Sequence, residues 1–432
     1  MNNPPPRLAL FSLACLLFAY ILSFVDRNVL AVLVGPVRHS LGISDFEFSL
    51  LHGWAFTLFY VILGIPIGWL ADHWDRRRII AIGVFLWSLM TGLCGLAESF
   101  AGLFIARIGV GIGEAALSPA AYSLLSDLFP ARRLQWATSI FALGIPLGTG
   151  ASYLLGAWIQ EAFRTGALDF LSLPAGMAVW QITFVLVGAP GLLIAALFCF
   201  VPEPPRQTRK NVEAAPSLRE TLGHIGAHWR AYLGLVGGVA LLSIANYGFM
   251  AWFPSLLVRS HGWTLAEAGK AFGPLFAIAG TLALLVSAAG AGWLRERGYT
   301  DANPRLLVLF TAALALPAIV MPLMPTAGGA LALATLVIFF GQGTFGVAMA
   351  GLQLITPNRM RAQTSAIALF CSNLFGLGLG ATFVALLTDF LFHDDTALRY
   401  SMALVSGLCY PLSAALAAWG LPHYRRALRE ET

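Results

Sequence analysis

The sequence predicts an all-α membrane protein in which twelve transmembrane helices form two bundles of six. Hydrophobic residues make up 58% of the 432-residue chain and charged residues 11%, whereas soluble proteins carry about 25% charged residues. Twelve apolar stretches approach or exceed the roughly 20 residues that a helix needs to cross a bilayer. A single long polar stretch, residues 202–229, separates the first six apolar stretches from the last six.

The apolar stretches define the predicted spans and domains. An N-terminal bundle covers residues 1–201, a cytoplasmic linker rich in proline and charge covers 202–229, and a C-terminal bundle covers 230–432. Residues 166–177 are predicted to form an extended loop between the fifth and sixth spans. The spans are residues 8–36, 47–71, 78–98, 101–128, 134–160, 178–201, 230–258, 266–294, 304–324, 328–356, 363–391 and 398–421.

The basic residues predict the orientation of the chain. Of the 26 Lys and Arg residues, 19 fall on the side that holds the termini and the linker, five fall on the opposite side, and two lie within spans. Cytoplasmic loops of membrane proteins carry an excess of Lys and Arg, so both termini are predicted to be cytoplasmic. Because the basic residues are divided among many loops, the net charge of +5 indicates topology rather than nucleic-acid binding.

Two ionisable residues, Arg107 and Glu114, lie inside the fourth span, which reads as one long helix over residues 101–128. A charged side chain at this depth costs at least ~2.5–3.5 kcal/mol, so it normally faces the interior of a bundle or a wet cavity. A spacing of seven residues is about two helical turns, which places both side chains on one face. The glycines between them, Gly109, Gly111 and Gly113, permit close backbone approach. Glu114 is therefore a candidate proton carrier, and a purely structural ion pair is the alternative.

The first span carries a second charged pair, Asp26 and Arg27. Adjacent helical residues point about 100° apart, so we expect Asp26 to face the bundle and Arg27 to reach a carbonyl or a second helix. At 1.5 Å per residue, Asp26 lies ~15 Å and Arg107 ~9 Å from the outer helix ends, so the two can meet, with Glu114 nearer the midplane. The alternative is that Asp26 and Arg27 only anchor the first helix at an interface.

The loop between the second and third spans, GWLADHWDRRRII, combines a glycine, a carboxylate and three arginines. A carboxylate at the inner end of one helix can bond helix N-termini and arginines across an interface, which would form a cytoplasmic latch. On composition alone, such arginines are more often a plain positive-inside signal. The candidate gate residues are Gly68, Asp72, Arg76, Arg77 and Arg78.

This loop resembles the signature loop of the major facilitator superfamily, and the arrangement of six plus six helices agrees with that superfamily. The matching positions are Gly68, Asp72, Arg77 and Arg78. His73 replaces a basic residue of the usual pattern and Asp75 replaces its second glycine, so the turn is expected to differ in shape. The resemblance implies the major facilitator fold, in which the two bundles rock around a site near the midplane.

Further motifs resemble the Spinster family of this superfamily. They are FVDRNVL, RIGVGIGEAALSPAAYSLLSDLFP, GIPLGTGASYLLG and PNRMRAQTSAIALFCSNLFGLGLGATFVALLTDF. The resemblance implies a proton-coupled or facilitative transporter, and animal Spinster proteins are associated with sphingosine-1-phosphate and lysophospholipids. It also implies that Asp26 and Glu114 are protonation sites, and that Arg107, with Arg27, pairs with a carboxylate or an anionic headgroup.

The superfamily resemblance also implies a central cavity lined by the first, fourth, seventh and tenth helices. Polar residues in membrane helices are often only contacts between helices, each contributing about half to one kcal/mol, and that reading stands beside the functional one. His52, near the outer end of the second span, reads as a simply hydrogen-bonded histidine. The candidate cavity residues of the second half are Asn246, Tyr247, Trp252, Gln342, Thr344, Gln353 and Asn373.

The charges concentrate in the first half, and the second half reads as an apolar wall. This asymmetry favours an amphipathic anionic substrate, such as a lysophospholipid or a sphingosine-1-phosphate-like lipid. A small organic anion, such as a sugar acid or an aromatic acid, is the alternative. No metal spacing, nucleophile motif or nucleotide loop is present, so we expect no enzymatic activity, cofactor, metal or nucleic-acid partner. Protons and membrane lipids are the expected partners of a monomer in a bacterial inner membrane.

Overall fold

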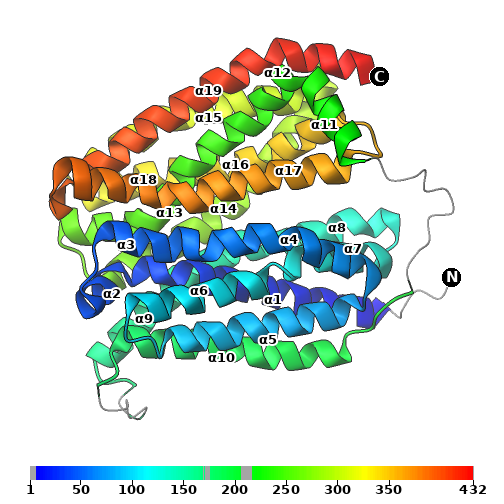
Figure 1. Cartoon of the computed structure of the whole chain (residues 1–432). Coiled ribbons are helices and arrows are strands. Elements are labelled where there is room, and N and C mark those ends of the chain that lie inside the picture. Colours follow the sequence, from blue (N-terminus) through cyan, green and yellow to red (C-terminus); the bar gives the residue numbers. More distant parts are fainter. Residues whose placement is uncertain (1–5, 169, 171–175, 206–216, 432) are drawn as a thin grey trace. The chain divides into compact units, whose positions relative to one another are not determined.

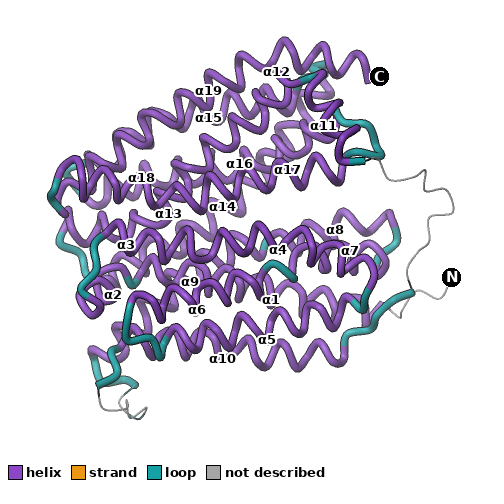
Figure 2. Tube along the Cα trace, viewed as in Figure 1, coloured by secondary structure: helices purple, strands orange, loops and turns teal. Residues whose placement is uncertain are grey.

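The computed structural model describes residues 6–168, 170, 176–205 and 217–431, and none of these residues lies in a strand (Figure 1, Figure 2). Twelve helical stretches are long and apolar enough to cross a membrane. Each coincides with one of the predicted spans to within a few residues at most ends. The predicted fold class, an all-α protein with twelve transmembrane helices, is confirmed.

The helices belong to two compact units. The first unit comprises Met1–Thr208 and Leu257–Ala277, and the second comprises Arg209–Leu256 and Ile278–Thr432. The boundaries after Leu256 and Ala277 fall inside two long helices, α13 (Gly238–His261) and α14 (Leu265–Glu296). Each of these helices contains a proline three residues or fewer before its boundary, Pro254 and Pro274 respectively. A segment from the second half of the sequence therefore packs as part of the first unit.

The first unit contains the helices of the first six spans together with the 257–277 parts of α13 and α14. Residues 169 and 171–175 of the predicted loop at 166–177 lie outside the described part of the chain. The helices are α1 (Pro6–Val32), α2 (Val34–Leu41), α3 (Asp45–Ser49), the π-helix η1 (Leu50–Trp54), α4 (Ala55–His73), α5 (Arg76–Cys94), α6 (Phe100–Glu114), α7 (Leu117–Leu128), α8 (Ala131–Ala142), α9 (Gly144–Arg164), α10 (Val179–Leu197) and the 3-10 turn η2 (Phe198–Phe200).

The second unit begins with a short helix inside the predicted linker. This helix, α11 (Leu218–Ala227), starts at a capping box in which Ser217 and Glu220 each accept from the other's backbone N–H. The remaining elements are α12 (Trp229–Tyr232), the π-helix η3 (Leu233–Gly237), α13, α14, α15 (Ala302–Val320), η4 (Met321–Leu323), α16 (Ala327–Leu354), α17 (Arg361–Asn373), the π-helix η5 (Leu374–Leu379), α18 (Gly380–Leu386), the π-helix η6 (Leu387–Phe392), η7 (Asp395–Ala397) and α19 (Leu398–Glu431).

The fourth span is not the single continuous helix that the sequence predicts. It divides after Glu114 into α6 and α7, with a turn at Ala115 and Ala116. Pro119 is the physical reason, because a proline lacks a backbone N–H and its ring collides with the carbonyl four residues earlier, here that of Ala115. The interruption makes Glu114 the last residue of α6, although Ala115 and Ala116 keep right-handed helical backbone angles.

The fifth span is interrupted in the same way. It divides into α8 and α9 at Leu143. The Leu143 N–H still donates to the Ser139 carbonyl, four residues earlier. Pro146 acts on the carbonyl of Ala142, so the regular ladder of hydrogen bonds cannot continue through this point. Both breaks follow from a proline near the middle of an otherwise apolar span.

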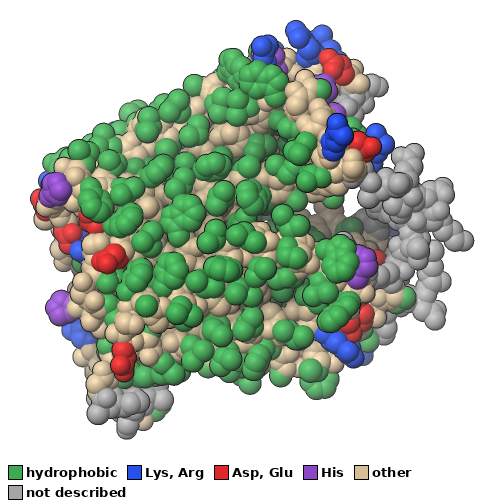
Figure 3. Space-filling model, viewed as in Figure 1, with side chains coloured by type: hydrophobic (Ala, Val, Ile, Leu, Met, Phe, Trp, Pro, Cys, Tyr) green, Lys and Arg blue, Asp and Glu red, His purple; other side chains and the backbone are tan. Residues whose placement is uncertain are grey.

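The surfaces of the helices match a lipid environment. On the face shown in Figure 3, hydrophobic side chains cover the flanks of the helices, and charged and histidine side chains gather at the helix ends. Many large apolar side chains of the protein are exposed, among them Ile65, Ile105 and Leu193 at 67%, 67% and 71%. In a soluble protein an exposed apolar surface of this extent marks an interaction site, and here the partner is the hydrocarbon of the bilayer.

Candidate functional site

Three glycines of α6 set the position of the charged side chains in the first unit. A Cβ on Gly111 would lie 2.4 Å from the carbonyl oxygen of Phe56 on α4, and a Cβ on Gly113 would lie 2.6 Å from the backbone nitrogen of Trp87 on α5. A Cβ on Gly109 would meet Met90 of α5 at 2.5 Å. The predicted close backbone approach is therefore present, and it wedges α6 between α4 and α5.

Gly111→Ala is expected to destabilise the protein by about 1–3 kcal/mol, because the new methyl group meets backbone that cannot move aside. Gly68→Ala on α4 is the matched control, since a Cβ there would find only the Cβ of Pro119 at an ordinary 3.8 Å. Thermal unfolding in detergent measures both variants. Equal melting temperatures for the two variants would show that the crossing at Gly111 is not tight.

A buried ion pair joins α1 to α6. Arg27 Nη2 donates to Glu114 Oε2 at 2.6 Å, and the two side chains are 7% and 1% exposed. The sequence predicts that Arg27 reaches a carbonyl or a second helix, and the structure places it on the carboxylate of that second helix. The pair spans 87 positions of the chain, so its formation depends on the packing of α1 against the α6–α7 turn.

Aromatic rings surround the guanidinium of Arg27. Its Cζ lies 4.8 Å from the ring centroid of Phe24, 4.6 Å from that of Phe56 and 5.1 Å from that of Tyr60. Such cation–π contacts contribute about 0.5–2 kcal/mol each, with the larger values when the cation is desolvated. Ring faces therefore support a positive charge whose hydration is lost, and they make an apolar wall beside it.

Arg107 contacts backbone rather than a carboxylate. Its Nη1 donates to the Asp26 carbonyl oxygen at 3.2 Å and its Nε donates to the Leu51 carbonyl oxygen at 3.4 Å. Leu51 belongs to the π-helix η1, and single π-helical turns inside helices are frequent at functional sites. The expected meeting of Arg107 and Asp26 thus occurs through the backbone of Asp26, and the Asp26 carboxyl borders Trp87 and Thr91 of α5.

Several polar atoms of this group lack hydrogen-bond partners among the residues that the structure describes. They include Asp26 Oδ1, Glu114 Oε1 and Arg107 Nη2, and around them His52 Nδ1, Trp87 Nε1 and Thr91 Oγ1. Asp26, Arg107 and Glu114 are all 2% exposed or less. A buried polar atom without a partner is costly, so a group of them marks a place where a proton, a water molecule or a ligand is accommodated.

His52 belongs to this group, although the sequence indicates only an ordinary histidine. It is 6% exposed in η1, its ring lies parallel to that of Phe48, and both Arg27 and Arg107 are near enough to act on its charge. Tyr60 and Phe56 are also additional members, and their spacing of four residues on the second span is the sequence signal that predicts a shared face. The sequence singles out four residues of this buried site: Asp26, Arg27, Arg107 and Glu114. The structure adds His52, Phe56 and Tyr60 to them.

The predicted inner latch centres on Arg76. This side chain is 1% exposed and forms ion pairs with Asp127 of α7 and with Glu203 at 2.7 Å, and it also donates to the carbonyls of Ser123 and Pro204. Asp75 caps the N-terminus of α5 by accepting from the Arg78 N–H. The residue that replaces the second glycine of the usual loop pattern therefore serves as a helix cap. Arg77 pairs with Asp75 at 3.3 Å.

Two other residues of the predicted latch behave differently. The side chain of Asp72 lies outside the described part of the structure. Gly68 does not permit an unusually close helix contact, because a Cβ there would be in normal van der Waals contact. The network around Arg76 thus connects α5, α7 and residues 203–204 within the first unit, and Gly68 is not required for it.

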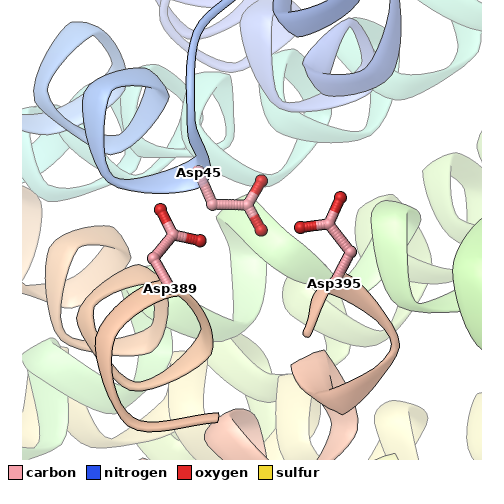
Figure 4. A group of neighbouring side chains, drawn as sticks. All are labelled: Asp45, Asp389 and Asp395. Atoms are coloured by element: carbon pink, nitrogen blue, oxygen red, sulfur yellow. The ribbon is translucent and has the colours of Figure 1, made fainter. Parts of the chain in front are cut away.

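A third buried carboxylate of the first unit, Asp45, was not identified from sequence. It begins α3 and has no exposed side-chain surface (Figure 4 shows its carboxylate), and it accepts from Arg259 Nη1 and Nη2 at 2.6 and 2.7 Å. Arg38 approaches the same carboxylate at 2.9 Å. Bidentate arginine–carboxylate pairs are among the strongest and most directional ion pairs. This pair ties residues from the two halves of the sequence, 214 positions apart, within one unit.

Glycines tighten the same connection between the halves. A Cβ on Gly150 of α9 would lie 2.6 Å from the carbonyl oxygen of Gly273 of α14, and one on Gly269 would lie 2.3 Å from the Cβ of Ala157. The rings of Tyr153 and Phe272 pack beside these glycines at 4.6 Å between centroids. The first unit therefore holds the 257–277 segment by both a buried ion pair and closely packed backbone.

The polar residues predicted for the second unit are mostly engaged with neighbouring helices. Asn246 Oδ1 accepts from the Tyr410 hydroxyl at 2.8 Å, Trp252 Nε1 donates to the Ala381 carbonyl at 2.9 Å, and Thr344 Oγ1 donates to the Gly341 carbonyl at 2.6 Å. The bonds of Asn246 and Trp252 join neighbouring helices of the bundle, whereas the bond of Thr344 stays within α16. Tyr410 could not be singled out from sequence, because its partner lies 164 positions away.

The remaining predicted residues of the second unit are more accessible. Tyr247 is half-buried, with its ring against Gly376, and Gln342 and Asn373 are also half-buried, whereas Gln353 is exposed. Among the described residues of this unit, Asp301 is the one charged side chain that is fully buried. Asp389 and Asp395, labelled in Figure 4, are half-buried and exposed, at η6 and η7. Buried charge is therefore concentrated in the first unit, as the sequence indicates.

The chain is similar to known proteins in both sequence and fold. A family model described as Major Facilitator Superfamily matches residues 16–381. An MFS-type efflux pump of Mycolicibacterium smegmatis is 29% identical over 99% of this chain and 96% of its own length. A probable L-galactonate transporter of Escherichia coli is 25% identical over 95% and 88% of the two chains. A crystal structure of a bacterial homolog of the human lysosomal transporter Spinster, inward-facing and unoccupied, superposes with a TM-score of 0.79 at 26% identity, covering 99% and 98% of the two chains.

Proposed function

Because the chain belongs to the Major Facilitator Superfamily, we propose that it is a proton-coupled transporter that moves an amphipathic anion by alternating access. The Arg27–Glu114 pair carries the proposal. It is a single ion pair, buried at membrane depth, and one oxygen of its carboxylate has no hydrogen-bond partner among the described residues. Ionisable residues inside a membrane are expensive and are typical of proton relays and substrate paths.

The proposed coupling follows from the contacts of this pair. Protonation of Glu114 removes its negative charge and weakens the bond to Arg27, which leaves the arginine able to receive an anionic group of the substrate. Asp26, whose carboxyl faces Trp87 and Thr91, is the second protonation site, and Arg107 keeps the local charge positive. The proton biases the conformational equilibrium only by as much as its affinity differs between the states.

The aromatic surroundings of Arg27 favour a substrate that combines an anionic head with an apolar tail. Phe24, Phe56 and Tyr60 present ring faces around the guanidinium. A lysophospholipid or a sphingosine-1-phosphate-like lipid has this chemistry. The second candidate is a small organic anion of the sugar-acid class, which the similarity to the L-galactonate transporter supports.

Uptake into proteoliposomes tests the proposal. Radiolabelled lysophosphatidate and labelled L-galactonate are offered separately, each with and without an inward proton gradient, and a protonophore is the control. We expect lysophosphatidate uptake that the gradient stimulates and the protonophore abolishes. Uptake of L-galactonate alone would select the second candidate, and uptake that ignores the gradient would contradict proton coupling.

The remaining features of the proposed transporter concern its setting. We propose that both termini face the cytoplasm, because 19 Lys and Arg residues lie on that side. Arg76, Arg77 and Arg78 then form a cytoplasmic gate with Asp127 and Glu203. The protein is proposed to act as a monomer in a bacterial inner membrane, with Asn246, Tyr247, Trp252, Gln342, Thr344, Gln353 and Asn373 contributing to its cavity.

A further inference from the structure

A surface pocket of the second unit lies where α12 meets the last turns of α19. It joins the first residues of the seventh span to the last residues of the twelfth, at the point where both leave the apolar region. Its cavity volume is about 160 Å³. The lining residues are Ala227, His228, Trp229, Arg230, Ala231, His423, Arg426 and Ala427.

The floor of the pocket is fixed by the core of the unit. Ala231 and Ala427 are 2% and 1% exposed and pack in the main apolar cluster of the second unit. One turn further along, a Cβ on Gly234 would lie 2.6 Å from the Cα of Gly420, so the two helices are in backbone contact just beneath the pocket. Tyr424, 1% exposed, donates to the Gly351 carbonyl at 3.1 Å and holds this part of α19 in place. The pocket is therefore a preformed feature with a rigid floor.

Two of its walls carry guanidinium groups without a carboxylate. Neither Arg230 nor Arg426 forms an ion pair with any residue that the structure describes, whereas the adjacent Arg425 pairs with the buried Asp301 at 2.6 Å. Burial alone would raise the pKa of the Asp301 carboxyl, but the bonds from Arg425 and Arg305 outweigh it and hold that pKa below its usual range. Arg425 is thus committed to a protein partner, and Arg230 and Arg426 are not.

Aromatic side chains border the same site. Trp229 and Trp419 are 49% and 42% exposed, and their rings lie 5.9 Å apart. The ring of Trp419 lies 5.3 Å from that of His423, and the Cζ of Arg230 lies 5.2 Å from the ring of Trp229. Tryptophan is enriched at the interface between the hydrocarbon and the headgroups, where its ring is apolar and its N–H is wet. The tryptophans place the pocket at the depth of lipid headgroups.

We propose that this pocket binds the anionic phosphate headgroup of a membrane lipid. Arginine suits this role because its planar fork matches phosphate oxygens bidentately. Basic pockets between transmembrane helices bind lipids such as cardiolipin. The histidines add donors, and the exposed tryptophans contact the glycerol and the upper acyl chain. Figure 3 shows Lys, Arg and His side chains gathering at the end of the second unit where α12 and the end of α19 lie. The site is independent of the charged group proposed to couple protons.

One acidic residue, Glu430, lowers the positive potential next to the pocket. Its substitution should change lipid binding in the direction opposite to loss of the arginines. Glu430 Oε2 lies 3.7 Å from His228 Nδ1 and is 54% exposed. Its negative charge opposes an anionic ligand next to the pocket. Glu430→Gln is therefore expected to tighten lipid binding, whereas loss of the arginines weakens it.

Thermal unfolding of the full-length protein in detergent, titrated with phosphatidylglycerol, tests the site. Phosphatidylcholine and inorganic phosphate are the comparison ligands. A double variant combines Arg230→Gln and Arg426→Gln. Two single variants carry Arg429→Gln and Glu430→Gln. We expect phosphatidylglycerol alone to stabilise the native protein. The double variant is expected to need about thirtyfold more lipid for the half-maximal shift, which corresponds to about 2 kcal/mol. Native mass spectrometry counts the lipids retained by each form.

The controls separate this site from other sources of binding. Arg429→Gln removes the same charge from an exposed residue outside the pocket and is expected to leave lipid binding unchanged. An equal loss in Arg429→Gln would show diffuse surface attraction and overturn the proposal. Stabilisation by inorganic phosphate at the same concentrations would mean a free-anion site and would also overturn it. An unaltered titration of the double variant, with its lipid-free melting temperature retained, would do the same.

Discussion

Glu114→Gln is expected to abolish the stimulation of uptake by a proton gradient while exchange of substrate between the two sides of the membrane continues. The amide keeps the shape of the carboxyl and can still accept a hydrogen bond from Arg27, but it cannot gain or lose a proton. Uptake along a substrate gradient does not need that proton. The measurement is the ratio of uptake with and without the gradient, which is expected to fall to about one, because only differential proton affinity drives the coupling.

The control is Glu161→Gln, which changes the same chemical group in an exposed pair with Arg164 at 2.7 Å. Exposed pairs contribute about 0–1 kcal/mol, so this variant is expected to keep both its stability and its gradient dependence. Glu114→Gln removes the negative charge from a buried ion pair, so the melting temperature of this variant is measured alongside transport. Retained stimulation by the gradient in a folded Glu114→Gln protein would eliminate Glu114 as the coupling residue.

Asp45→Ala is expected to cause the largest loss of stability among the ion-pair variants of the first unit, about 3–5 kcal/mol. Removing one partner of a buried ion pair is strongly destabilising, and here both Arg38 and Arg259 contact the Asp45 carboxylate. Arg259→Gln is expected to cost more than Arg38→Gln, because Arg259 makes two short bonds and Arg38 makes one ion pair at 2.9 Å. Thermal unfolding of the purified variants measures these differences.

A double-mutant cycle isolates the Asp45–Arg259 interaction. Asp45→Ala combined with Arg259→Gln is expected to be less destabilised than the sum of the single variants, with a coupling energy of about 0.5–3 kcal/mol. Glu47→Gln on the same short helix is the comparison, since Glu47 only completes the capping box with Ser44 at an exposed position. Additive losses would indicate that Asp45 acts through the cap of α3 rather than through Arg259.

The composition of the charged group could be predicted from sequence, but its pairing could not. Asp26, Arg27, Arg107 and Glu114 stand out because charge is rare within apolar spans. Which arginine binds Glu114 depends on the rotation of α1 about its axis and on the turn that follows Glu114. The rotation of α1 and the geometry of that turn are set by helix packing. The sequence of each span therefore leaves both Arg27 and Arg107 as candidate partners of Glu114.

Asp45 shows a different reason for a missed residue. It follows Ser44 at the start of a span, where an acidic residue is typical of a helix N-terminus and needs no further explanation. Its partner, Arg259, is equally ordinary as a charge at the end of a span. Only the three-dimensional structure brings together two residues that are 214 positions apart and buries the carboxylate.

The breaks in the fourth and fifth spans could be foreseen in principle. Pro119 and Pro146 are visible in the sequence, but membrane helices often tolerate proline, so hydropathy alone predicts continuous spans. The structure adds that each break falls three or four residues before its proline. The roles of the polar residues of the second unit, in contrast, could not be foreseen. The same residue types occur in the wall of a cavity and in contacts between helices.

The division of α13 and α14 between the two units has a mechanical consequence. Each helix is a continuous rod that passes from one unit to the other along the chain. Pro254 and Pro274 stand next to the crossing points, and each removes one backbone bond from the rod at that place. Each proline is therefore expected to lower the bending stiffness of its helix close to the residue where the helix passes from one unit to the other.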